Sequence, residues 1–256
     1  MAIASHKIIQ IPFLTKVLST DAFAQHRFSR WFVKQFKPLA PVDDFHSEHD
    51  KADELIGVPV SIRVDHAGAV ITQAIEIDAA IELSLTESLV DSGYVHPALG
   101  VSFSRGETWL AVKTNSALPS DWPSLFDIIG KNLNCLLETS RAVIPWLSLF
   151  NEVQMVLSDY YLRSNNQAEN NRLSGIWIEP KSSLFGTVLS PGPDLSAGAY
   201  AWLIGDSARL NEWLDTLYDY LAEQTLHSPN LLIESGGIQY GLSKFAKLKT
   251  MINRWR

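Results

Sequence analysis

A run of neutral polar side chains at helical spacing is the part of this sequence best suited to binding. Asn151, Gln154 and Ser158 recur three or four residues apart, with Met155 beside them, so they share one face of a predicted helix. Solvent-facing helix surfaces normally carry charged residues, and a neutral amide face is therefore unusual. It indicates either amides that satisfy backbone groups of a loop or a partner, or a site for a polar ligand. The candidate ligand- or partner-binding residues are this face and its neighbours: Asn151, Glu152, Gln154, Asn165, Asn171 and Trp177.

A second place with ligand chemistry is the acidic segment 42–54, where His46 and His49 lie among aspartates and glutamates. Imidazole and carboxylate groups are common ligands of transition metals. The spacing specifies no third ligand, however, and a solvated acidic loop is the favoured interpretation. We therefore predict no metal site.

Ser235-Gly236-Gly237 follows a predicted strand and is able to present backbone amides to an anion, although a simple turn is the favoured interpretation. The sequence contains no P-loop, no dinucleotide-binding glycine motif, no Gly-x-Ser-x-Gly and no His-Glu-x-x-His. The single cysteine, Cys135, rules out an intramolecular disulfide and a multi-cysteine zinc site. No catalytic residue and no cofactor is predicted.

Charge and hydropathy narrow the function classes further. The net charge of −7 argues against a nucleic-acid partner. The N-terminal residues do not form a signal peptide, and no apolar run reaches the roughly 18–20 residues of a membrane span. We expect a cytoplasmic protein without a membrane partner. Basic residues gather near both ends and would form one patch if the ends met, although solvated helix faces are favoured: Lys7, Lys16, Arg27, Arg30, Lys34, Lys37, Lys244, Lys247, Lys249, Arg254 and Arg256.

Hydrophobic periodicity predicts the elements that must position these residues. The predicted strands are 7–14, 58–64, 69–74, 98–103, 108–113, 174–178, 200–204 and 230–234. The predicted helices are 21–36, 83–92, 122–130, 145–162, 207–223 and 243–254. Hairpins dominate the first half, and strands alternate with helices in the second, as in βαβ units. The fold class is therefore α/β (or α+β), with a mixed sheet and helices packed on it. We expect one compact domain over 1–256, with a possible soft boundary at the acidic linker 42–54.

The stretch 130–177 resembles a known bacterial family. The pattern consists of Gly130-Lys131-Asn132, Pro145-Trp146, the run from Asn151 to Leu157, and Ile176-Trp177. It is similar to that of the RpfE-type regulatory proteins, often labelled as phosphoglycerate mutases. The resemblance implies a cytoplasmic accessory or regulatory role. One departure is Ile178-Glu179-Pro180-Lys181, which stands where the family has a glycine-rich run.

Three functions follow as hypotheses. The preferred one is a non-enzymatic cytoplasmic regulatory protein that binds another protein or a small polar ligand. The alternatives are a metal-dependent phosphoryl-transfer enzyme like the phosphoglycerate mutases, and a small-molecule or nucleotide sensor. The seven histidines are scattered, and none lies in the Arg-His-Gly context of a phosphorylated histidine. The partner-binding hypothesis is preferred because the sequence lacks catalytic constellations and because of the family resemblance.

Overall fold

The computed structural model describes residues 7–41, 54–66, 68–106, 109–134, 141–164, 173–185, 192–243 and 246–247. The chain groups into two compact units. Unit 1 comprises Met1–Ala52, Ser182–Trp202 and Asp206–Arg256, and unit 2 comprises Asp53–Lys181 with Leu203–Gly205. The chain first crosses from unit 1 to unit 2 between Ala52 and Asp53, within the segment 42–54 where the sequence predicts a soft boundary. Whether the units fold as one domain stays a prediction.

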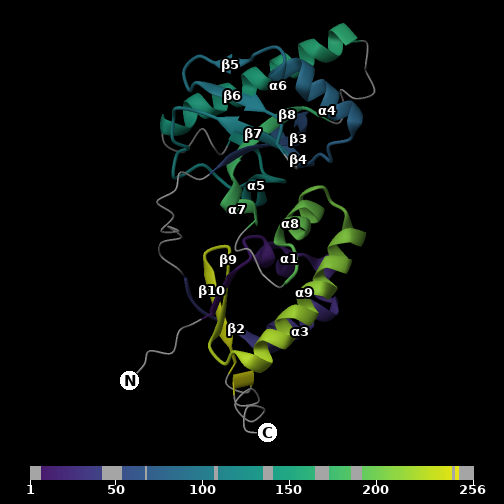
Figure 1. The fold of residues 1–256 in the computed structure, drawn as a ribbon, viewed down its shortest axis with the longest axis vertical. Helices are drawn as coiled ribbons and strands as arrows, with labels where there is room; N and C mark the ends of the chain where they lie inside the picture. Colours follow the sequence, from purple (N-terminus) through teal and green to yellow (C-terminus); the bar gives the residue numbers. More distant parts are fainter. Residues whose placement is uncertain are drawn as a thin grey trace. The chain divides into compact units, whose positions relative to one another are not determined.

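Unit 2 is built on an antiparallel sheet with the order β4-β3-β7-β6-β5, to which β8 adds by pairing with β3 (Figure 1). Its strands are β3 (Leu55–Asp65), β4 (Gly68–Ala74), β5 (Val95–His96), β6 (Val101–Ser104), β7 (Leu110–Lys113) and β8 (Gly175–Pro180). The long strand β3 pairs with β4 near its end, and with β7 and β8 near its start. The predicted hairpins β3–β4 and β6–β7 are confirmed.

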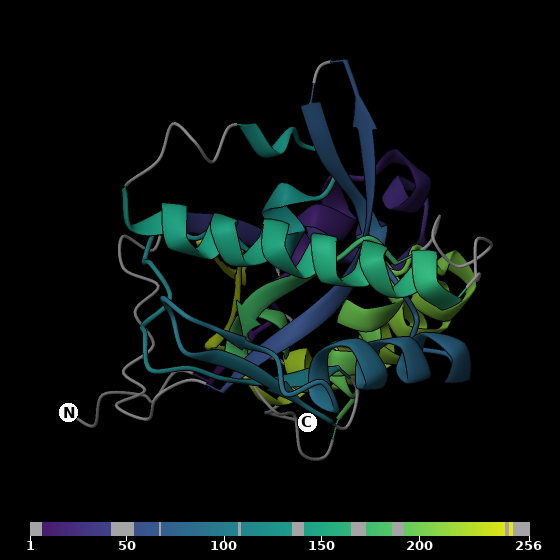
Figure 2. The same ribbon diagram turned by 90° about the horizontal axis from the view of Figure 1, so that it is seen from above.

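The helices of unit 2 are α4 (Ala79–Leu85), the π-helical turn η1 (Thr86–Val90), α5 (Leu125–Ile128), the 3₁₀ turn η3 (Arg141–Val143) and α6 (Ile144–Ser164). Figure 2 shows α6 as one continuous helix that runs across β3 and β8. Pro145 lies in its first turn, where proline costs no hydrogen bond. The predicted helix 145–162 is confirmed.

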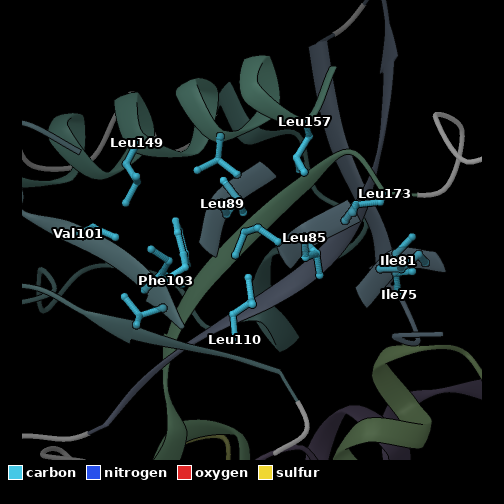
Figure 3. Packing of buried hydrophobic residues seen from close by; sticks show 14 of the residues in the cluster. Ile75, Ile81, Leu85, Leu89, Val101, Phe103, Leu110, Leu149, Leu157 and Leu173 are labelled. Carbon is cyan, nitrogen blue, oxygen red and sulfur yellow. The ribbon is translucent and has the colours of Figure 1, made fainter. Parts of the chain in front are cut away.

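The core of unit 2 lies between α6 and the sheet. Leu149 and Leu157 point from α6 toward Phe103 and Leu110 of the strands, as Figure 3 shows. Leu85 of α4 and Leu89 of η1 lie in the middle of this layer, and Ile81 of α4 lies at one end of it beside Ile75. Apolar residues at spacings of three and four on α6 meet alternate residues of the strands, which is how a helix buries its stripe on a sheet.

Unit 1 contains a mixed four-stranded sheet with the order β1-β9-β10-β2. The strands are β1 (Lys7–Gln10), β2 (Phe36–Pro41), β9 (Leu231–Ser235) and β10 (Ile238–Leu242). The pair β1–β9 is parallel, whereas β10 is antiparallel to both of its neighbours. The helices are α1 (Leu14–Ser19), α2 (Asp21–Ala24), α3 (Arg27–Gln35), α7 (Lys181–Phe185, whose first residue belongs to unit 2), α8 (Leu195–Leu203, whose last residue belongs to unit 2) and α9 (Ser207–His227).

The α/β class, with helices packed on sheets and mixed strand pairing, is confirmed. The second half does alternate strand and helix, but β8 belongs to the sheet of unit 2 and β9 to that of unit 1. Within the described residues, β1–β9 is the parallel pair, so parallel pairing joins the first strand to a late one. The alternation predicted from the sequence is therefore distributed over two sheets.

Two predicted elements are wrong. The predicted strand 200–204 is the end of helix α8. This helix packs closely on α9 at Gly198, where an added Cβ would lie 2.3 Å from the Trp213 ring. The predicted helix 21–36 is two helices, broken at residues 25–26, and Pro38 lies in strand β2. That strand is at the sheet edge, where proline is tolerated. The predicted helix 243–254 lies mostly outside the described residues.

None of the described helices combines the length and the apolar character needed to cross a bilayer.

Candidate functional site

Three of the six candidate binding residues lie on the middle of α6. Asn151 is exposed, and Glu152 and Gln154 are partly buried. The stem of Gln154 lies over strand β8, since a Cβ on Gly175 would be 3.4 Å from its Cγ. Asn165 and Asn171 lie outside the described residues. The structure therefore places the amide face at the surface of unit 2, with Gln154 partly used to cover a strand.

Trp177 does not belong to that surface. It is completely buried in β8, where its ring stacks on Trp122 with centroids 4.5 Å apart and meets the edge of Phe150 at 5.4 Å. The expectation that Trp177 borders a binding site needs correction, because β8 is buried along nearly its whole length. Trp177 supports the site only by packing beneath α6 through Phe150.

Glu152 gathers a hydrogen-bonded group that sequence spacing does not reveal. Its Oε2 accepts from the Tyr94 hydroxyl at 3.3 Å, and its Oε1 lies 3.4 Å from His96 Nε2 and 3.5 Å from Ser148 Oγ. Tyr94 and His96 lie more than fifty positions away along the chain and come from the segment around β5. No short motif connects them to Glu152, so only the fold brings them together.

His96 is held as a structural residue within this group. The side chain is buried, and its Nδ1 accepts a hydrogen bond from the backbone N–H of Leu99 at 3.3 Å. An accepting Nδ1 assigns the ring proton to Nε2, which then faces the Glu152 carboxylate. Both ring nitrogens are used, and the imidazole is not available as a general base. The group positions Glu152 at the surface.

Tyr94 gives this group a pH signature. Burial, the negative charge of Glu152 and the hydrogen bond to that carboxylate raise the pKa of Tyr94 far above its ordinary value of 10.0. The folded state therefore keeps the phenol protonated where the unfolded chain ionises it. The contribution of Tyr94 to stability is complete below about pH 10 and is lost as the pH rises further.

We expect the free energy of unfolding to fall between about pH 9 and about pH 11, and to fall less steeply in Tyr94→Phe. Urea denaturation at both pH values measures the difference between the two slopes. Burial also raises the pKa of Tyr240, so the variant should keep part of the slope. Identical slopes in the two proteins would show that Tyr94 is not held by Glu152.

The solvent side of α6 carries an uncharged stripe, which we call the α6 face. It consists of residues spaced alternately four and three apart, namely Ile144, Ser148, Asn151, Met155, Ser158 and Leu162. All six are exposed, and the large apolar members Ile144, Met155 and Leu162 are 57%, 69% and 70% exposed. Single exposed apolar residues are ordinary, but an aligned set on one helix indicates an interaction surface.

One border of the α6 face is acidic. Glu152 and Asp159 lie one position beyond members of the stripe, on the same side of the helix. Glu87 of η1 joins them, because its Oε2 accepts a 2.8 Å hydrogen bond from the hydroxyl of Tyr160 on α6. Arg163, whose Nη2 lies 3.9 Å from Asp159, is also on this side near the helix end. The opposite border is formed by Leu147 and Gln154, which are uncharged.

The other candidate sites of the sequence analysis either have a structural role or lie outside the described residues. Ser235-Gly236-Gly237 is the turn between β9 and β10, with positive φ at both glycines, and Ser235 Oγ accepts from the backbone N–H of Thr15 at 2.9 Å. The favoured interpretation as a turn is confirmed. His46, His49 and Cys135 lie outside the described residues. The described part of the chain contains no group of three or more potential metal ligands.

The basic residues near the two ends cannot be joined into one described patch. Lys244, Lys249, Arg254 and Arg256 lie outside the described residues. Arg27 pairs with Asp215 and Asp219 of α9, and its guanidinium lies 4.6 Å from the Tyr218 ring centre. Arg27, a member of the first basic group, therefore makes its ion pairs and its ring contact within unit 1.

The segment that departs from the resembling family also serves the fold. Glu179 of β8 is completely buried, and its carboxylate accepts from Ser124 Oγ at 2.7 Å and from the backbone N–H of Leu125 at 2.9 Å. Trp122 Nε1 donates to the neighbouring Ile178 carbonyl at 2.8 Å. These bonds tie the start of α5 to β8.

A small cavity of about 190 Å³ lies in unit 2, away from the α6 face. Its lining consists of Ile77, Glu82, Leu85, Thr86, Arg105, Gly106, Trp109 and Leu110. Pockets for nucleotide-sized ligands usually measure roughly 300–1,000 Å³. This cavity is below that range.

Comparison with known proteins gives no match, whether against family models, curated proteins or solved structures.

Proposed function

We propose that this protein is a non-enzymatic, cytoplasmic regulatory protein that acts by binding another protein through the α6 face. The observation that carries the proposal is the alignment of three exposed apolar side chains with three uncharged polar ones along one helix. Burying such a stripe against a partner removes apolar surface from water without leaving a charge unpaired.

The layout beneath the stripe supports the same proposal. Leu149, Val153 and Leu157 anchor α6 to the sheet from its other side, so the stripe is presented by a helix that is held firmly in the core. A preformed surface loses little conformational freedom on binding. The resemblance of the run from Asn151 to Leu157 to the RpfE-type regulatory proteins points in the same direction.

The proposal predicts that charge on the stripe abolishes binding and leaves the fold intact. Met155→Glu combined with Leu162→Glu should weaken partner binding by about a hundredfold or more, since it buries two unpaired carboxylates. Both side chains are exposed, so the free energy of unfolding should change by less than about 1 kcal/mol. Quantitative co-purification from cells that express the protein naturally, followed by titration of the recovered partner, measures the loss.

The matched control is Val64→Glu combined with Leu83→Glu, which adds the same charge at two apolar positions that are 75% and 55% exposed in the same unit. We expect this control to bind as the unchanged protein does. Equal loss of the partner in both double variants would mean that charge in general, and not the α6 face, governs binding. Retention in both would remove the α6 face as the site.

A further inference from the structure

We propose that the occupant of the α6 face is an amphipathic helix of a different protein that carries lysines or arginines along one edge. This inference rests on the proposed function and deepens it by naming the chemistry of the partner. Its two supports are the period of the stripe and the unequal charge of its two borders.

The period of the α6 face fits a second helix. Its members alternate spacings of four and three residues from Ile144 to Leu162, which is the repeat along which two helices pack side by side. The stripe extends over about 27 Å at 1.5 Å per residue, so a partner helix of about five turns would cover it.

The borders of the stripe specify the charge of that helix. Glu87, Glu152 and Asp159 lie along one border together with Arg163, so this border carries three acidic residues and one basic residue, whereas the other border, Leu147 and Gln154, is uncharged. Tyr160 and Tyr94 donate hydrogen bonds to two of these carboxylates and so hold them beside α6. A helix with basic residues on the facing edge would complement this border, and a helix with acidic residues there would be repelled.

The same border disfavours a second copy of this chain as the occupant. In an antiparallel pair of identical helices, like borders face each other. Glu152 and Asp159 would then face the same border of the other copy, on which acidic residues outnumber the single Arg163, and the net effect is repulsion. The net charge of −7 adds to the repulsion between copies.

Asn151 lies near the centre of the stripe and adds a selective element. A single asparagine at such a position fixes the register of paired helices at some cost in stability. We expect the partner helix to place a polar side chain opposite Asn151. A fully apolar helix would leave the exposed amide buried without a hydrogen bond.

The experiment is a selection from a display library of helix-biased peptides of about 21 residues, long enough to cover the stripe. The intact protein is the bait, and the Met155→Glu/Leu162→Glu variant removes peptides that bind elsewhere. Enriched peptides should carry apolar residues at alternating spacings of three and four and a positive net charge. Asp159→Lys should weaken a representative peptide by about tenfold, and a lysine-to-glutamate change on its facing edge should restore much of that loss.

The outcomes separate this inference from the proposed function. Enriched peptides that depend on the stripe but are neutral or acidic would overturn the basic-helix inference and leave the α6 face as a binding site. A selection that yields no peptide sensitive to Met155→Glu/Leu162→Glu would count against both. Sedimentation of the protein alone should show a monomer at micromolar concentration. A dimer that the same double variant dissociates would identify the occupant as a second copy.

Discussion

Replacing Trp177 by alanine is expected to lower the free energy of unfolding of unit 2 by about 3–5 kcal/mol, the usual cost of deleting a large buried aromatic side chain. Trp177 is 0% exposed and contacts Trp122 and Phe150 by stacking and edge contacts. Its removal opens a cavity between β8 and the base of α6 and loses both ring contacts. Urea denaturation followed by circular dichroism measures the change without relying on tryptophan fluorescence.

Trp177→Phe is the matched control for this prediction. It keeps an aromatic ring beside Trp122 and Phe150, and it removes an indole N–H that has no acceptor in the described part of the chain. We therefore expect a smaller loss than for alanine, since phenylalanine fills part of the cavity and keeps aromatic contacts with Trp122 and Phe150. If alanine costs less than about 1 kcal/mol, Trp177 is not a core residue, and its place among the binding residues would have to be restored.

Replacing Glu179 by alanine is expected to cost about 2–6 kcal/mol, since each of the two donors that lose their acceptor costs about 1–3 kcal/mol. The Glu179 carboxylate is fully buried and accepts from both Ser124 Oγ and the Leu125 N–H. Alanine leaves these donors buried without an acceptor at the start of α5. Denaturation in urea gives the free energy, and hydrogen exchange at Leu125 should accelerate more than exchange in α6.

Two comparisons sharpen the Glu179 prediction. Glu179→Gln keeps one acceptor oxygen in place and should cost less than alanine. Glu54→Gln disrupts an exposed ion pair, in which Lys181 Nζ lies 2.8 Å from the Glu54 carboxylate, and should change stability by less than about 1 kcal/mol. Equal effects at positions 54 and 179 would mean that the buried carboxylate contributes no more than a surface charge.

Strong periodicity accounts for the parts of the fold that the sequence predicts well. The apolar side chains of 207–223, from Leu210 to Leu221, predict the buried face of α9 residue by residue. The alternation around 58–74 likewise predicts the β3–β4 hairpin. In both cases the local pattern and the tertiary environment agree, so no long-range information is needed.

The misassigned elements lack such a pattern. Residues 200–204 are a short apolar run, and periodicity alone cannot distinguish a buried helix end from a strand. Gly198 decides the case, because its missing side chain lets α8 lie against Trp213, a contact that depends on the fold. From the sequence alone, Pro38 is expected to end a helix. In the structure it lies in the edge strand β2, where a residue without a backbone N–H is tolerated because one side of the strand has no neighbour among the described strands.

The candidate site was predictable in part. The helical spacing of Asn151 and Met155 identifies a shared face, and the structure places both at the surface of α6. The links from Glu152 to Tyr94 and His96 were not predictable, because β5 and α6 are distant in sequence and no spacing rule connects them. Trp177 was misplaced because proximity in sequence to the amide face does not imply a shared surface.

The parallel pairing of β1 with β9 has a consequence for synthesis on the ribosome. Residues paired between these strands lie 224 positions apart, so at about 5–20 residues per second β1 waits on the order of 11–45 s for its neighbour. Each strand pair described in unit 2 is available once β8 has been translated. We therefore expect the nascent chain to complete the sheet of unit 2 while Ile9, which becomes buried beside β9, still lacks its neighbouring strand.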